Sequence, residues 1–221
     1  MKATDMSKRR ADPEMRSRLL EAAAKLLAVE GPSALTTRRT AAEAGATTMA
    51  VYTHFGSIGD LVDAVVDEGF ARLSDLFDDV ERTDNPVADL AGLSRAYVTN
   101  ALSNPHLYAV MFGSASLGGY RPNTPDELSA GKYTFDEIIE VTGRAIAAGQ
   151  IVADDATNVA AQLWSTLHGV LMLHTAGYFG SGREAAERIL VPALINLMTG
   201  LGADPAIVDS VVAQGQSVST N

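Results

Sequence analysis

The chain has 221 residues, of which 47% are hydrophobic and 20% charged, and its formal net charge is -10. This length and apolar content predict one or two domains with a buried core. The absence of cysteine excludes disulfide bonds and cysteine-ligated zinc sites. The charged start, MKATDMSKRR, lacks the apolar region of a signal peptide, and no apolar run is long enough to span a membrane. We therefore expect a cytoplasmic protein with no membrane partner.

Charge is distributed unevenly along the chain. Residues 1–55 contain nine Lys or Arg and six Asp or Glu, which gives +3 and leaves -13 for the remainder. A basic head on an acidic body favours a protein that presents one face to phosphate groups. The alternative is a chance asymmetry caused by a basic tail.

The first predicted helix begins at Pro13, with Asp12 as its cap, and ends before Gly31 and Pro32. Apolar residues recur along it at helical spacing and predict one buried face. These residues are Met15, Leu19, Ala22, Ala23, Leu26 and Leu27.

Two short helices are predicted next, with a tight turn at Gly45 between them. The first runs from a cap at Thr36 or Thr37 to about residue 44, and the second from about 47 to 55. The second is too short to be stable alone, so Val51 and Phe55 are expected to anchor it. This layout is typical of a helix-turn-helix that sets its second helix into the major groove of DNA.

Side chains on these two helices suit DNA contacts. Small, methyl-bearing and aromatic groups that can reach base edges are Thr47, Thr48, Met49, Ala50 and Tyr52. His54 is placed to donate to a phosphate, and the guanidinium groups of Arg38 and Arg39 can reach guanine or the backbone. The alternatives are that Tyr52 and His54 cap a small core and that both arginines are solvated surface residues.

The remaining sequence predicts helices over about 59–80, 87–103, 105–112, 126–148, 155–179 and 183–201. A Gly-, Pro- and Ser-rich loop is expected over 113–125, and frayed residues from about 202. Pro192 is expected to kink the last helix or to shift its start. Since no segment alternates with a period of two, the predicted fold class is all-α.

Residues 12–66 resemble the TetR family of bacterial transcriptional regulators. The resemblance is carried by LLEAAAKLLAVEGPSALTTRRTAAEAG and by VYTHFGSIGDLVDAV. It implies a homodimer, with an N-terminal three-helix helix-turn-helix DNA-binding domain over 1–58 and a helical ligand-binding and dimerisation domain over 59–221. The DNA-binding residues that it implies are Thr37, Arg38, Thr47, Thr48, Met49, Tyr52 and His54.

The chain departs from this family at one position. The family commonly has a lysine after the serine of the motif, where this chain has Ile58 after Ser57. One phosphate contact per subunit is then missing, and the salt dependence of DNA binding is expected to be shallower. The basic residues Lys8, Arg9 and Arg10 offer a replacement along the DNA backbone.

The C-terminal half also resembles part of the family. LWSTLHGVLMLH, residues 163–174, is similar to the Trp-x3-His-Gly signature of one C-terminal subgroup, and NPHLYAVMFGSA, residues 104–115, looks like the short helix upstream of it. Candidate residues for a small, mostly apolar effector are Tyr108, Phe112, Trp164, His168 and Met172. The alternative for Trp164 and His168 is a packed core pair on one helical face.

Two helices near the C-terminus carry the dimer prediction. Leucines at 190, 194, 197 and 201 form one stripe, and Ser165, Gly169 and Ala176 form a line that allows close helix approach. Together they predict an intermolecular four-helix bundle, unless both stripes serve only the monomer core.

The resemblance implies a DNA-binding repressor that a small effector releases from its operator. We expect no catalytic site, cofactor or metal, because the sequence lacks nucleophile-elbow, P-loop, dinucleotide-binding and zinc-protease motifs. The alternative is an all-helical interaction protein whose N-terminal head binds a protein partner.

Overall fold

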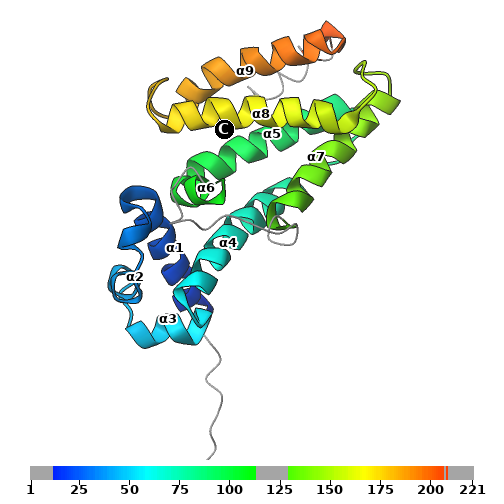
Figure 1. Ribbon diagram of the computed structural model, residues 1–221. Coiled ribbons are helices and arrows are strands. Elements are labelled where there is room, and N and C mark those ends of the chain that lie inside the picture. Colours follow the sequence, from blue (N-terminus) through cyan, green and yellow to red (C-terminus); the bar gives the residue numbers. More distant parts are fainter. Residues whose placement is uncertain (1–11, 113–128, 207, 209–221) are drawn as a thin grey trace, which may run out of the picture. The chain divides into compact units, whose positions relative to one another are not determined.

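The computed structural model describes residues 12–112, 129–206 and 208 (Figure 1). All regular structure in these residues is helical, which confirms the all-α prediction. The described residues form two compact units, which we call the head and the body. The head comprises residues 12–69 and 106–112, and the body comprises residues 70–105 together with the described residues from 129 onward.

The first helix of the head, α1 (Pro13–Glu30), begins and ends where the sequence predicts. The Asp12 carboxylate accepts a hydrogen bond from the Glu14 amide at 3.1 Å, and Gly31 ends the helix with φ 81°. A short 3-10 helix, η1 (Pro32–Ala34), follows and was not predicted from the sequence.

Helices α2 (Thr37–Glu43) and α3 (Thr48–Phe55) are joined by the predicted turn. Thr36 caps α2 by accepting a hydrogen bond from the Arg39 amide at 3.3 Å. Gly45 has φ 63°, and the Ala46 amide donates to the Ala41 carbonyl at 2.7 Å. These are the features of a Schellman motif, which needs a residue that tolerates positive φ after the helix.

The head core explains why two further helices pack with it. Leu61 and Val65, in the first half of α4 (Ile58–Asp78), are fully buried in the core that also contains the leucines of α1. Leu107 and Val110 of α6 (Pro105–Met111) belong to the same core. The compact unit therefore includes α6 and the first half of α4 beside the N-terminal helices, and the domain boundary expected at residue 58 stays a prediction.

The body is built from the second half of α4 and four further helices: α5 (Pro86–Ser103), α7 (Ser129–Ala147), α8 (Ala156–Thr175) and α9 (Arg183–Gly200). Helix α8 packs against α5, α7 and α9 (Figure 1). Leu163, Leu167 and Leu171 lie on one face of this helix and are all buried.

The last two helices test two predictions, and one of them is wrong. Helix α8 ends at Thr175 instead of 179, because Gly177 adopts φ 87° and the Tyr178 amide donates to the Leu173 carbonyl at 3.1 Å. Helix α9 begins at Arg183 as predicted and continues through Pro192, so the proline does not shift its start.

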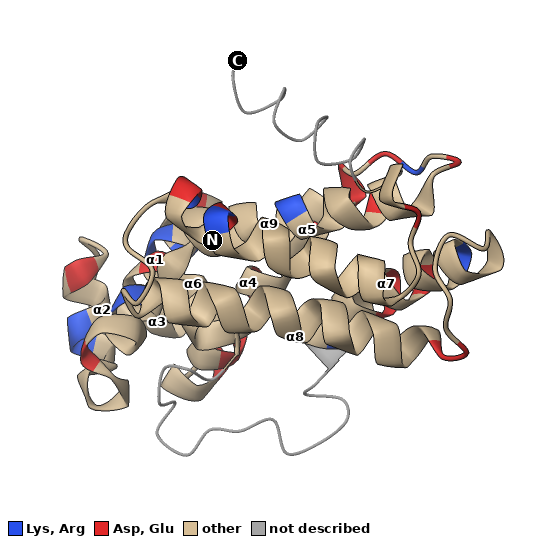
Figure 2. Cartoon of the chain, turned by 90° about the horizontal axis from the view of Figure 1, so that it is seen from above, with Lys and Arg blue, Asp and Glu red and all other residues tan. Residues whose placement is uncertain are grey.

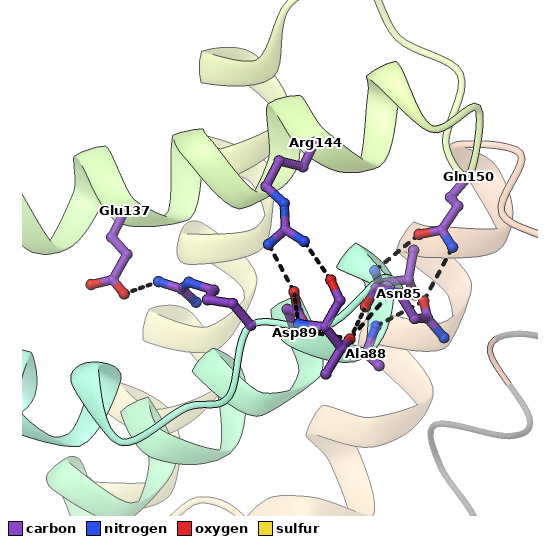
Figure 3. Close-up of polar contacts among 9 residues, drawn as sticks. Asn85, Ala88, Asp89, Glu137, Arg144 and Gln150 are labelled. Atoms are coloured by element: carbon purple, nitrogen blue, oxygen red, sulfur yellow. Dashed lines mark hydrogen bonds and ion pairs between the residues drawn. The ribbon is translucent and has the colours of Figure 1, made fainter.

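A buried polar network joins the start of α5 to α7 (Figure 3). The Asp89 carboxylate is 2% exposed and accepts hydrogen bonds from the Thr83 amide at 3.1 Å, the Thr83 hydroxyl at 2.7 Å and Arg144 Nη1 at 2.9 Å. Arg144 also donates to the Thr83 carbonyl. Beside this group, Gln150 Nε2 donates to Asn85 Oδ1 at 3.2 Å. The network satisfies a buried carboxylate and fixes the loop between α4 and α5.

Two predictions fall on residues outside the described part of the chain: the loop at 113–125 and the basic residues Lys8, Arg9 and Arg10. The fraying expected from about 202 does not hold for Ala203 and Val208, which are buried, and the residues beyond 208 lie outside the described part. Among the helices that are described, none combines the length and apolarity that crossing a membrane requires.

Candidate functional site

Most of the predicted DNA-binding residues lie exposed on one part of the head. Met49 is 68% and Tyr52 is 53% exposed, although both side chains are large and partly apolar. Thr47 and Thr48, at the start of α3, are exposed as well. Thr37 Oγ1 lies 3.5 Å from the Tyr52 hydroxyl, so the start of α2 and the middle of α3 contribute to one surface.

The two neighbouring arginines of α2 differ in their contacts. Arg39 makes two hydrogen bonds to the Glu30 carboxylate, at 2.9 and 2.7 Å, and this guanidinium lowers the pKa of Glu30. Arg38 is exposed and forms no ion pair with any acidic residue that the structure describes. Arg39 is therefore engaged within the head, and a DNA contact by either arginine stays a prediction.

His54 has a different environment from the rest of the set. It is half-buried, and its Nδ1 is shielded from solvent without a hydrogen-bond partner among the described residues. Its ring centroid lies 6.2 Å from that of Phe55. A phosphate contact by His54 remains a prediction, and it would have to come from the other ring nitrogen.

Helix α3 is held in place as predicted. Val51 is fully buried and Phe55 packs on the head core. The sequence did not predict two contacts that support this arrangement. The Arg16 guanidinium lies 5.5 Å from the Phe55 ring centroid. Lys25 Nζ lies 2.6 Å from the Glu43 carboxylate, which ties α1 to α2 and raises the pKa of Lys25.

The position where the family commonly has lysine is used for packing. Ser57 accepts a hydrogen bond from the Asp60 amide at 3.1 Å and caps α4. The next residue, Ile58, is partly buried against the head core. An aliphatic side chain there replaces a cation with apolar contact.

Restoring a lysine at this position should change salt dependence. For Ile58→Lys we expect tighter DNA binding at low salt and a salt slope steeper by about one unit per subunit, since each added phosphate contact contributes about 0.9. Fluorescence anisotropy across a salt series measures the slope. The Ile58→Ala variant controls for lost packing and should leave the slope unchanged. An equal slope for both variants would contradict this role for the position.

The predicted effector residues fall into two groups. Tyr108 and Phe112 belong to the head, where their rings meet edge to face with centroids 5.2 Å apart. Trp164 and His168 lie together in the body, with ring centroids 6.1 Å apart, and Met172 lies one turn further along α8.

Trp164 and His168 share a hydrogen-bond partner on α5. Trp164 Nε1 donates to the Tyr97 hydroxyl at 3.1 Å, and that hydroxyl lies 3.1 Å from His168 Nδ1. Because the hydroxyl accepts from Trp164, its own proton is available for His168 Nδ1, which favours the neutral imidazole. Burial also lowers the pKa of His168. The arrangement fits the alternative of a packed pair whose polar atoms are satisfied.

A cavity of about 820 Å³ lies elsewhere in the body, between α5 and α9. None of the five predicted effector residues lines it. The sequence offered no motif for it, because its lining has the helical spacing of ordinary core residues. Arg95 of α5 lines this cavity, and the sequence did not identify it as a candidate binding residue.

An exposed α3 held on a compact helical head, together with a separate helical body, is typical of helix-turn-helix regulators. The family model of bacterial regulatory proteins of the tetR family matches residues 19–65, and the tetracyclin repressor-like C-terminal domain model matches residues 90–194. The chain belongs to the TetR family. The Trp-x3-His-Gly subgroup remains a prediction.

Solved structures have the same fold. A protein of unknown function from Rhodococcus sp. RHA1 is 27% identical with a TM-score of 0.67, over 89% of this chain and 99% of that one. The TetR family transcriptional regulator PfmR from Thermus thermophilus is 19% identical with a TM-score of 0.68. The match covers 81% of this chain and 97% of that one. A TetR transcription regulator from Haloarcula marismortui is 23% identical with a TM-score of 0.69. The match covers 86% of this chain and 99% of that one. No curated protein matches the chain significantly.

Proposed function

We propose that this protein is a transcriptional repressor that binds operator DNA as a homodimer and leaves it when a small effector binds the body. The role is regulatory and involves no catalysis. The observation that carries the proposal is the exposure of Arg38, Met49 and Tyr52 on a head whose α3 is anchored by the fully buried Val51. Large exposed side chains on a rigidly held short helix suit insertion into a groove.

The start of α3 supports a phosphate contact. Thr47 occupies the N-cap position, yet its side chain makes no capping hydrogen bond. The first amides of α3 are therefore available to a phosphate oxygen, and the helix dipole favours negative charge there. Arg38 would add a guanidinium contact, and Tyr52 a ring for thymine methyl groups and a hydroxyl for phosphate.

The body offers a surface for a second copy. Helix α8 contains no Lys, Arg, Asp or Glu along its length (Figure 2). Ser165 and Gly169 are exposed on it, and beside them on the same helix Leu173 is 47% exposed. On α9, Ile189 is 37% exposed. Small residues next to exposed apolar ones favour close helix packing between subunits.

Dimerisation and release are linked by geometry. Two recognition helices read half-sites one DNA turn apart only when their separation is about 34 Å. An effector that binds better to a state with another separation shifts the population away from the DNA-binding state.

A gel-shift experiment with the DNA upstream of the protein's own gene tests the proposal. We expect one discrete complex that contains two chains per site and resists competition by unrelated duplex. A failure to form a selective complex, together with recovery of a protein bound through the head, would favour the alternative of a protein-interaction module.

A further inference from the structure

The cavity between α5 and α9 has the size of a small-molecule site. Its volume of about 820 Å³ lies within the range of about 300–1,000 Å³ that ligand pockets occupy. Leu163 of α8 also lines it. All of the lining residues belong to the body, so the cavity is complete within one compact unit.

The cavity is charged at one end and aliphatic at the other. Arg183 Nη2, at the start of α9, donates to Thr99 Oγ1 near the end of α5 at 3.0 Å, so the two helices run antiparallel. The first turns of α9 supply charged lining residues, including Glu184 and Arg188. The later turns of α9 and the start of α5 supply only aliphatic lining: Val87, Leu90, Val191, Leu194, Ile195 and Met198.

Arg95 stands between these two ends. It lines the cavity from α5, where it is exposed to solvent. No acidic side chain in the described residues pairs with this guanidinium, whereas Arg183 is paired with Glu187 at 3.2 Å. Partial burial lowers the pKa of the Arg95 guanidinium.

We propose that this cavity binds an amphipathic anion, with an aliphatic chain along the Val191–Met198 end and the anionic head on Arg95. The unpaired guanidinium supplies the charge complementarity, because carboxylate and phosphate groups accept two parallel hydrogen bonds from arginine. The aliphatic end supplies apolar burial for the chain. This site refines the proposed function, since it gives the effector a location and a chemical class.

Isothermal titration of the full chain tests the chemistry, with probes kept below their micelle concentrations. Dodecanoate and dodecyl phosphate are the anionic probes and separate the two possible heads. Dodecanol and dodecyltrimethylammonium have the same chain with a neutral and a cationic head. We expect at least one anionic probe to bind with one molecule per chain and to raise the melting temperature. Equal binding of all four probes, or binding of none, would overturn the proposal.

Two variants locate the site. Arg95→Gln should weaken binding of the anionic probe by about ten-fold or more, because it removes a charge-assisted hydrogen bond. Arg18→Gln, which removes an exposed arginine of the head, is the matched control and should bind like the parent. Ala91→Phe should abolish binding by filling the cavity. Parent-like affinity in Arg95→Gln would contradict the assignment, even if Ala91→Phe fails to fold.

Gel shifts on the same samples separate this proposal from the proposed function. A parent chain that binds DNA selectively but no anionic probe would overturn the effector site alone. If Ala91→Phe loses the dimer, a second copy of the chain occupies the cavity. If the probe binds only after residues 209–221 are removed, those residues occupy the cavity in the full chain. Either result would contradict the proposal.

Discussion

Replacing Arg144 by methionine is expected to lower the stability of the body by about 3 kcal/mol, because it leaves a buried carboxylate without its cation. Asp89 is 2% exposed and would keep only the amide and hydroxyl of Thr83 as donors. Arg144 also holds the Thr83 carbonyl, so the loop before α5 would lose contacts from both groups. The shift in the midpoint of urea unfolding, followed by circular dichroism, measures the effect.

Another ion pair on the same helix provides the control. Lys132 and Asp136 lie 3.1 Å apart on α7 with 70% and 52% of their side chains exposed. Lys132→Met should therefore change stability by less than about 1 kcal/mol. The double variant Asp89→Asn with Arg144→Met should recover part of the loss, since the buried charge is gone. Equal effects of Arg144→Met and Lys132→Met would show that the network adds nothing beyond a surface pair.

The second large effect concerns DNA. The double variant Arg38→Ala with Tyr52→Ala should weaken operator binding by about 100-fold or more, since each groove contact contributes about 1–3 kcal/mol. Both side chains are exposed, so the melting temperature should remain close to that of the parent. Fluorescence anisotropy with a labelled operator measures the affinity.

Arg18→Ala with Tyr133→Ala removes the same two residue types from other exposed positions. This control should bind DNA within about two-fold of the parent, because it removes no groove contact. Parent-like affinity in the Arg38 and Tyr52 variant, or a similar loss in the control, would overturn the assignment of the DNA-binding surface.

Local signals explain why much of the head was predictable. Asp12, Thr36 and Gly45 act on backbone groups within a few residues, so their chemistry alone fixed helix ends that the structure confirms. The position of α6 was not predictable in this way. Leu107 joins the head core across more than forty residues of sequence, and helical spacing does not reveal which core a helix joins.

The same limit applies to the polar contacts and to the cavity. The pairing of Arg39 with Glu30 leaves Arg38 as the arginine without an ion pair, although the two are adjacent and chemically identical. Asp89 and Arg144 lie 55 positions apart. The spacing of Arg95 within α5 resembles that of any surface arginine. Long-range contacts decide these features, and a single sequence carries no direct record of them.

Selection of binding sites from random duplex DNA by the purified full chain tests the central claim most directly. A homodimer with two recognition helices predicts enrichment of an inverted repeat with two chains on each site. The half-site centres should be about 10 base pairs apart or a multiple of that spacing. Enrichment of a single half-site bound by one chain, or no enrichment above the starting pool, would contradict the account.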